Sequence, residues 1–117
     1  LQGGRIDDLL LTGYNVTLDS EEKVRLLSPI GSDFAYYAVY GWAAADGLPP
    51  DAAPGPDTIW SLSEGETLTP ATPVTMTWDN GAGLTFSRTI SVDDDYMFDI
   101  SQSVTNSTDA AVSLAPY

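Results

Sequence analysis

Three consecutive carboxylates, Asp93, Asp94 and Asp95, are the densest group of titratable side chains in the sequence. Neighbouring carboxylates could hold a metal ion or act as an acid/base pair. A calcium-binding loop, however, alternates its acidic residues, contains a glycine and ends on a bidentate glutamate. The triplet is contiguous, and no Gly or Glu follows it directly. Because neighbouring side chains of an extended chain point in opposite directions, we expect no metal ion here.

The segments on either side of the triplet predict a structural role for it. Residues 84–92 alternate apolar side chains with Ser and Thr, and residues 96–104 alternate in the same way. This period of two is typical of strands with one buried face. Asp is depleted in strands, tolerates left-handed backbone and bonds its own backbone, so it suits turns. The pattern predicts an antiparallel hairpin with the triplet as its turn.

One position breaks the alternation, because Arg88 falls on the apolar side of the first strand. An inward arginine needs a polar partner or must extend its head group to solvent. We expect a structural role for Arg88, with Asp99 or an acid on a neighbouring strand as its partner.

Composition excludes most catalytic chemistry. The chain has no Cys and no His, which rules out thiol catalysis, a Ser-His-Asp triad and metal sites built from these ligands. A glycosidase-like carboxylate pair remains conceivable, but the acidic residues form no distinctive motif. The net charge of −13 repels nucleic acid and anionic lipid. We therefore predict neither an enzyme nor a bound cofactor or metal.

Aromatic residues offer a different kind of site. Tyr40, Trp42 and Trp60 flank a long loop rich in Pro, Gly and Asp over residues 44–58. Long loops of this kind are usually functional or mobile. The three rings could line a groove for a sugar, a lipid tail or a peptide. They could equally fill the core of a small domain, and the sequence leaves both interpretations open.

The remaining pattern predicts an all-β fold with little or no helix. The length of 117 residues suits a single domain covering residues 1–117. About eight or nine short strands with turn residues between them are typical of an antiparallel β-sandwich. Residues 34–43 are apolar on both sides, which predicts a strand covered on both faces. Residues 13–15 carry a turn signal that would lead into a short strand at residues 16–18.

Several segments resemble a known family in the same order along the chain. They are RIDDL from Arg5, LLSP from Leu26, AYYAVYGW from Ala35, GPDTIW from Gly55, WDNGAGLTFSRTISVDDDYMF from Trp78 and the final VSLAPY. Together they are similar to the periplasmic domain of the YidC membrane protein insertases in its alphaproteobacterial form. The resemblance covers nearly the whole chain.

This resemblance implies a β-supersandwich at the periplasmic face of the bacterial inner membrane, between the first two transmembrane helices of a membrane-embedded parent protein. It implies a non-catalytic role in partner contact or scaffolding, with accessory Sec translocon subunits and nascent membrane proteins as partners. The family domain is longer, so we expect an open sheet edge near residues 114–117, and a monomer or weak dimer in isolation. The alternative is an independent carbohydrate- or peptide-binding β-sandwich.

Overall fold

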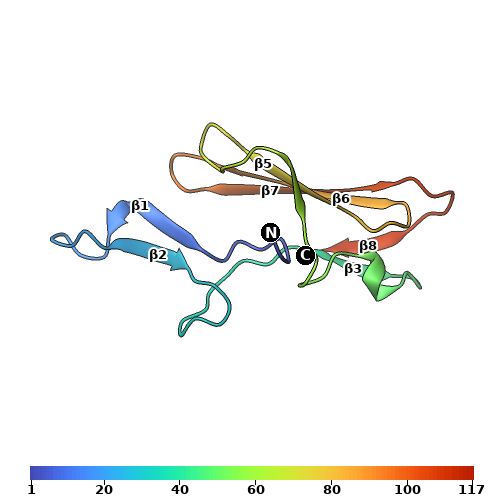
Figure 1. Cartoon of the computed structure of the whole chain (residues 1–117), viewed down its shortest axis with the longest axis horizontal. Coiled ribbons are helices and arrows are strands. Elements are labelled where there is room, and N and C mark those ends of the chain that lie inside the picture. Colours follow the sequence, from blue (N-terminus) through green and yellow to red (C-terminus); the bar gives the residue numbers. More distant parts are fainter. The chain divides into compact units, whose positions relative to one another are not determined.

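Strands make up almost all of the regular structure in the computed structural model, which describes residues 1–117 (Figure 1). In chain order the elements are β1 (Leu9–Asn15), β2 (Lys23–Leu27), β3 (Trp42–Ala45), the 3-10 turn η1 (Pro50–Ala52), β4 (Ser61–Glu64), β5 (Val74–Asp79), β6 (Leu84–Val92), β7 (Phe98–Asn106) and β8 (Ser113–Pro116). Every strand pair is antiparallel. No helix has the length and apolar character needed to cross a membrane. The prediction of an antiparallel all-β fold with little helix is confirmed.

The chain divides into two compact units. Unit 1 comprises Leu1–Gly4 and Tyr40–Tyr117, and unit 2 is the intervening segment Arg5–Val39. The chain therefore leaves unit 1 after Gly4 and re-enters it at Tyr40. That residues 1–117 form a single domain stays a prediction.

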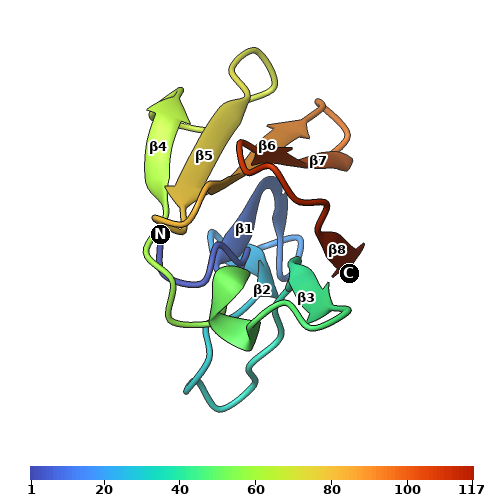
Figure 2. The ribbon, with the colours of Figure 1, turned by 90° about the vertical axis from the view of Figure 1, so that its right-hand side faces the viewer.

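Unit 1 contains a four-stranded sheet with the order β4-β5-β6-β7 (Figure 2). Strand β6 alternates strictly between buried and half-buried residues, as the sequence pattern predicts. Its inward side chains are Leu84, Phe86, Arg88 and Ile90, and its other side carries Ser and Thr. The register with β7 is unbroken from Leu84 to Val92, so the faces of the two strands stay aligned.

The second sheet of unit 1 pairs β3 with β8. The Trp42 ring, at the start of β3, lies 5.0 Å from the Phe86 ring of β6 in an edge-on arrangement. Phe86 is fully buried, and Trp42 is 6% exposed. The inner face of the four-stranded sheet thus packs on the other sheet through aromatic side chains, which gives unit 1 a layered core.

The predicted strand at residues 34–43 is wrong in extent and burial. Only its last two residues belong to β3, while Tyr36 and Ala38 form isolated bridges. Phe34 is 88% exposed and Tyr36 is 68% exposed. The apolar run has the composition of a buried strand, but only its last part, Gly41 and Trp42, is buried, whereas residues 34–39 are exposed or half-buried.

Unit 2 is built around the β1–β2 hairpin, continued by bridges that pair Ser28 with Tyr36 and Ile6 with Ala38. None of its residues is buried. The turn predicted at residues 13–15 is wrong, because these residues belong to β1. The chain reverses later, where the Val16 amide donates to the Glu22 carbonyl at 2.8 Å, so residues 16–18 are turn rather than strand.

Candidate functional site

The most unusual side chain of unit 1 is Arg88, which is 1% exposed and lies in the middle of β6. It is the only buried charged residue in the structure. Its place follows from strand periodicity, because it shares the inward side with Phe86 and Ile90. A charge in such a position must be compensated by hydrogen bonds or an opposite charge.

Four hydrogen bonds compensate the guanidinium group. Its Nε and Nη2 donate to Gln102 Oε1 at 3.2 and 2.9 Å. Its Nη2 also donates to the Tyr40 carbonyl at 2.6 Å, and its Nη1 donates to the Gly4 carbonyl. The planar fork of donors suits this arrangement, since one rigid group can reach several acceptors at once.

The expectation of an acidic partner for Arg88 is wrong. Gln102 is the residue directly opposite Arg88 in the register of β6 and β7, whereas Asp99 lies opposite Ser91. Asp99 is three residues from Gln102, so its side chain points to the other face of the strand, where it is exposed. Strand parity thus gives Arg88 a neutral amide rather than a carboxylate.

The two carbonyls held by Arg88 mark the neck of unit 2. We use "neck" for Gly4 and Tyr40, the residues at which the chain leaves and re-enters unit 1. Both carbonyls accept hydrogen bonds from the same guanidinium group. Arg88 therefore ties to the central sheet the two residues of unit 1 that flank the intervening segment.

Aromatic rings enclose the guanidinium carbon. It lies 5.0 Å from the Trp60 ring centroid, 5.7 Å from that of Trp42 and 5.9 Å from that of Tyr40. The two tryptophans stack on each other, with centroids 6.3 Å apart. Cation–π contacts of this kind gain strength where water is excluded. Burial lowers the pKa of Arg88, and Coulombic interactions with Tyr117 and Tyr40 oppose that shift.

Gly4 makes the close packing possible. Its φ is +58°, and a Cβ built on it would meet Arg88 Nη1 at 2.7 Å and Trp60 Nε1 at 2.8 Å. Backbone pairing places it there, because the Gly3 amide donates to the Thr58 carbonyl at 2.8 Å. Trp60 Nε1 is buried and has no hydrogen-bond partner, so this dense packing leaves one polar group unsatisfied.

The three aromatic residues predicted to line a groove thus converge on Arg88. Trp42 and Trp60 are 6% and 3% exposed, and Tyr40 is half-buried. Their ring faces contact a side chain of the protein itself. Ligand binding by these rings stays a prediction, and the geometry gives them a packing role.

The triplet forms the end of the β6–β7 hairpin. Asp93 Oδ1 accepts hydrogen bonds from the amides of Asp95 at 2.9 Å and Met97 at 2.8 Å. Tyr96 has a φ of +62°, the left-handed conformation that lets this turn close. Asp94 and Asp95 are exposed. No group of three or more acidic side chains is placed to hold a metal ion.

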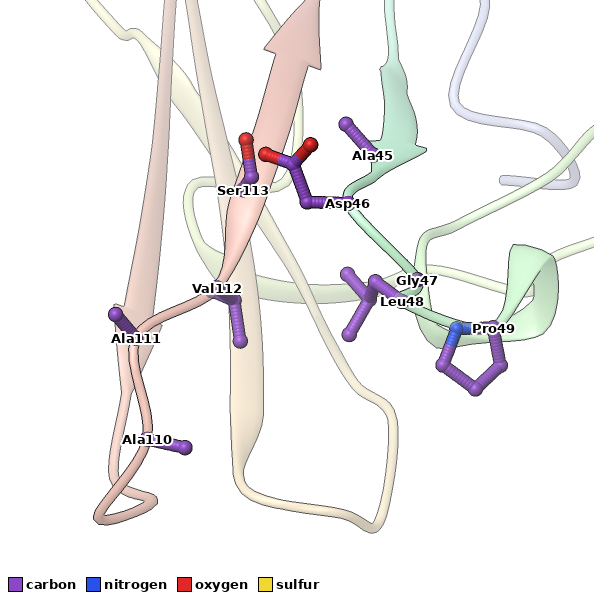
Figure 3. Close-up of a pocket in the computed structure, with 9 residues that line it drawn as sticks. All are labelled: Ala45, Asp46, Gly47, Leu48, Pro49, Ala110, Ala111, Val112 and Ser113. Carbon is purple, nitrogen blue, oxygen red and sulfur yellow. The ribbon is translucent and has the colours of Figure 1, made fainter.

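A pocket of about 430 Å³ lies between the turn that follows β3 and the segment that enters β8 (Figure 3). Residues 45–49 and 110–113 line it, and most of them are Ala, Leu, Pro, Val or Gly. The turn is tight, because the Leu48 amide donates to the Ala45 carbonyl at 3.1 Å while Asp46 and Gly47 both have positive φ. This pocket was not predicted from the sequence, although Asp-Gly at residues 46–47 is a known turn signal.

A second pocket of about 430 Å³ lies within the Pro/Gly loop, beside Trp78. No hydrogen bond joins a hydroxyl to a carboxylate in either pocket, and Arg88 lines neither of them.

The family model and similar curated proteins point to the same family. The model of the YidC periplasmic domain family matches residues 1–117. The membrane protein insertase YidC of a Ruegeria species (strain TM1040) is 60% identical over the whole chain, and those of Roseobacter denitrificans and a Jannaschia species (strain CCS1) are 55% and 53% identical. No solved structure matches.

The chain covers 19% of the length of the Ruegeria relative and 20% of the Roseobacter relative. The match therefore concerns one segment of a much longer protein. This segment contains the whole of both units, including Arg88 and the aromatic rings around it. The chain belongs to the YidC periplasmic domain family.

Proposed function

We propose that the chain is a non-catalytic domain on the periplasmic face of the inner membrane, within a membrane protein insertase, and that it acts in partner contact or scaffolding. The observation that carries the proposal is the family match over residues 1–117, together with relatives named as insertases. The proposed partners are accessory Sec translocon subunits and nascent membrane proteins.

One feature of the molecule supports a contact role, and a second supports a role without catalysis. Fifteen large apolar side chains are exposed, ten of them in unit 2, among them Leu18 and Phe34. Where exposed apolar side chains form a contiguous surface, that surface is typical of protein contact sites. The one buried charge, in contrast, is fully engaged in holding the fold together.

The first test concerns the native protein in its source cells. An antibody against this chain would be used to follow the antigen through alkaline extraction, and its peptides would be mapped by mass spectrometry. We expect an antigen that stays with the membrane and carries long apolar segments on both sides of residues 1–117. A soluble antigen without such segments would overturn the proposal.

The second test separates scaffolding from catalysis. The intact parent protein would carry a photo-crosslinking residue at Leu18 or Phe34 in unit 2, with Ser103 on the exposed side of β7 as the control position. We expect partner crosslinks from unit 2 that exceed those from Ser103. Deleting the segment that encodes this chain from the parent protein should leave insertion of a reporter protein intact.

Complete loss of insertion at a normal protein level would contradict the non-catalytic role. A glycan-dependent change in the tryptophan fluorescence of the isolated chain would instead favour the alternative of an independent binding module.

A further inference from the structure

Unit 1 has a one-sided surface charge. It contains eleven of the 17 acidic residues but only one of the four basic ones, Arg88, which is 1% exposed. The other three basic side chains belong to unit 2, where Arg5 pairs with Asp7 and Arg25 pairs with Asp8. The surface of unit 1 thus presents carboxylates and no cationic side chain.

The pocket of Figure 3 lies in this anionic surface. Asp46 stands on its wall, and no hydrogen bond or ion pair engages the carboxylate. Asp46 is also one of two non-glycine residues with positive φ, at +50°. Backbone in this region is strained for most residues and is tolerated by Asp, so the turn holds a free carboxylate beside apolar side chains.

The dimensions of the pocket suit one apolar side chain with its flanking backbone. Its volume of about 430 Å³ falls within the usual range for binding pockets. Strand β8, which begins at the pocket, pairs with β3 on one side only. Its other edge leaves backbone groups available to an extended peptide, which could add as a further strand.

We propose that this pocket docks an extended segment of a partner protein in which an apolar residue is flanked by Lys or Arg. The apolar side chain would enter between residues 46–49 and 110–113, and a neighbouring cation would pair with Asp46. The absence of any exposed cation in unit 1 disfavours an acidic peptide and an anionic lipid surface. The proposal deepens the partner-contact role above and rests on it.

The test uses the full chain and a labelled probe. The probe is a fluorescein-tagged ten-residue peptide of alternating Lys and Leu, and binding is followed by anisotropy and by amide shifts in NMR spectra. We expect shifts confined to residues 45–49 and 110–116 and an affinity that falls as salt is raised. Peptides with Glu in place of Lys, or Ser in place of Leu, should bind at least about tenfold more weakly.

Matched variants distinguish binding at the pocket from attraction of the peptide by the overall negative charge of the protein. Asp46→Asn keeps a residue that accepts left-handed backbone and should weaken binding about fivefold. Asp94→Asn removes the same charge from the far hairpin and should change the affinity less than twofold. Ala110→Phe, in an exposed segment of the lining, should abolish binding by filling the pocket.

Equal losses for Asp46→Asn and Asp94→Asn would overturn the proposal, as would equal binding of the Lys/Ser peptide. Peptide-induced shifts outside residues 45–49 and 110–116 would do the same. Each of these outcomes leaves the cell-based crosslinks unaffected, so failure of the pocket and failure of the contact role are distinguishable.

Discussion

The two units of the chain solve the problem of folding in opposite ways. Unit 1 surrounds one buried guanidinium group with rings and carbonyls and has a layered core. Unit 2 has paired strands, exposed ion pairs and no buried residue at all. An isolated two-stranded hairpin is only marginally stable in water. The difference teaches that regular hydrogen bonding and stability are separate properties, and that here only unit 1 contains what supplies stability.

The strongest way to break this contrast is to remove one arginine from each unit. Arg88→Ala should destabilise the chain by about 3–5 kcal/mol, because it leaves two buried carbonyls and an amide without donors. Arg5→Ala breaks only a partly exposed pair with Asp7 at 3.1 Å and should cost at most about 1 kcal/mol. Urea unfolding followed by tryptophan fluorescence measures both.

Equal unfolding midpoints for the two variants would remove the idea that Arg88 organises the core. Arg88→Lys sharpens the comparison, because it keeps the charge and loses the planar fork. We expect its stability to lie between those of Arg88→Ala and the unchanged protein.

Hydrogen exchange should separate the units next. Amides of β5, β6 and β7 should exchange only on global unfolding, whereas those of β1 and β2 should open locally because none of the residues in these two strands is buried. We expect exchange in unit 2 to be at least about a hundredfold faster. Amide-resolved NMR of the native chain measures this, and equal protection in both hairpins would show that unit 2 is stabilised in a way its burial does not indicate.

A pair of glycine substitutions gives a smaller effect of the same kind. Gly4→Ala introduces a side chain at positive φ and against Arg88 and Trp60, and should cost about 2–4 kcal/mol. Gly31→Ala, in unit 2, has the same backbone problem at φ +92° but meets open space, and should cost only the backbone strain of about 1–2 kcal/mol. Thermal melts of the two variants provide the comparison, and an inverted order would contradict the tight packing at the neck.

The smallest effect concerns acid stability. The amide of Gly81 and the hydroxyl of Thr85 bond the Asp79 carboxylate and lower its pKa. A lowered pKa in the folded state adds stability above the ordinary value, and this contribution is lost as pH falls through the shifted pKa. Asp79→Asn should therefore flatten the melting temperature profile below about pH 4.

Asp94→Asn is the matched control for this profile, because no hydrogen bond engages the Asp94 side chain. A change of equal size in both variants would show that total charge, rather than the Asp79 hydrogen bonds, sets the acid limit.

The sequence predicted the central sheet well, because burial of one face leaves a period of two. Residues 74–78, 84–92 and 98–104 alternate clearly, and all three became strands of one sheet. The prediction of a covered strand at residues 34–43 was wrong for residues 34–39, none of which is buried. The periodicity of a sequence shows which side chains a strand would bury. It does not show whether another part of the fold covers that face.

The partner of Arg88 was beyond sequence reasoning for another reason. That Arg88 points inward follows from the alternation around it. Its acceptors are backbone carbonyls, and every residue supplies one regardless of its type. Only the fold brings Gly4 and Tyr40, 36 positions apart in the sequence, onto one guanidinium group. The pocket beside Asp46 depends in the same way on residues 110–113 arriving from the other end of the chain.

The hydrogen bonds from Arg88 to the neck have a consequence for how far the length of residues 5–39 can change. Because Arg88 holds the two unit 1 residues that flank the intervening segment, we expect the central sheet to tolerate changes in the length of that segment. The free-energy cost of closing a loop grows only slowly with loop length, by about 0.6 kcal/mol for each doubling. We therefore expect the neck to accept a longer, shorter or different segment while the four-stranded sheet of unit 1 keeps its register.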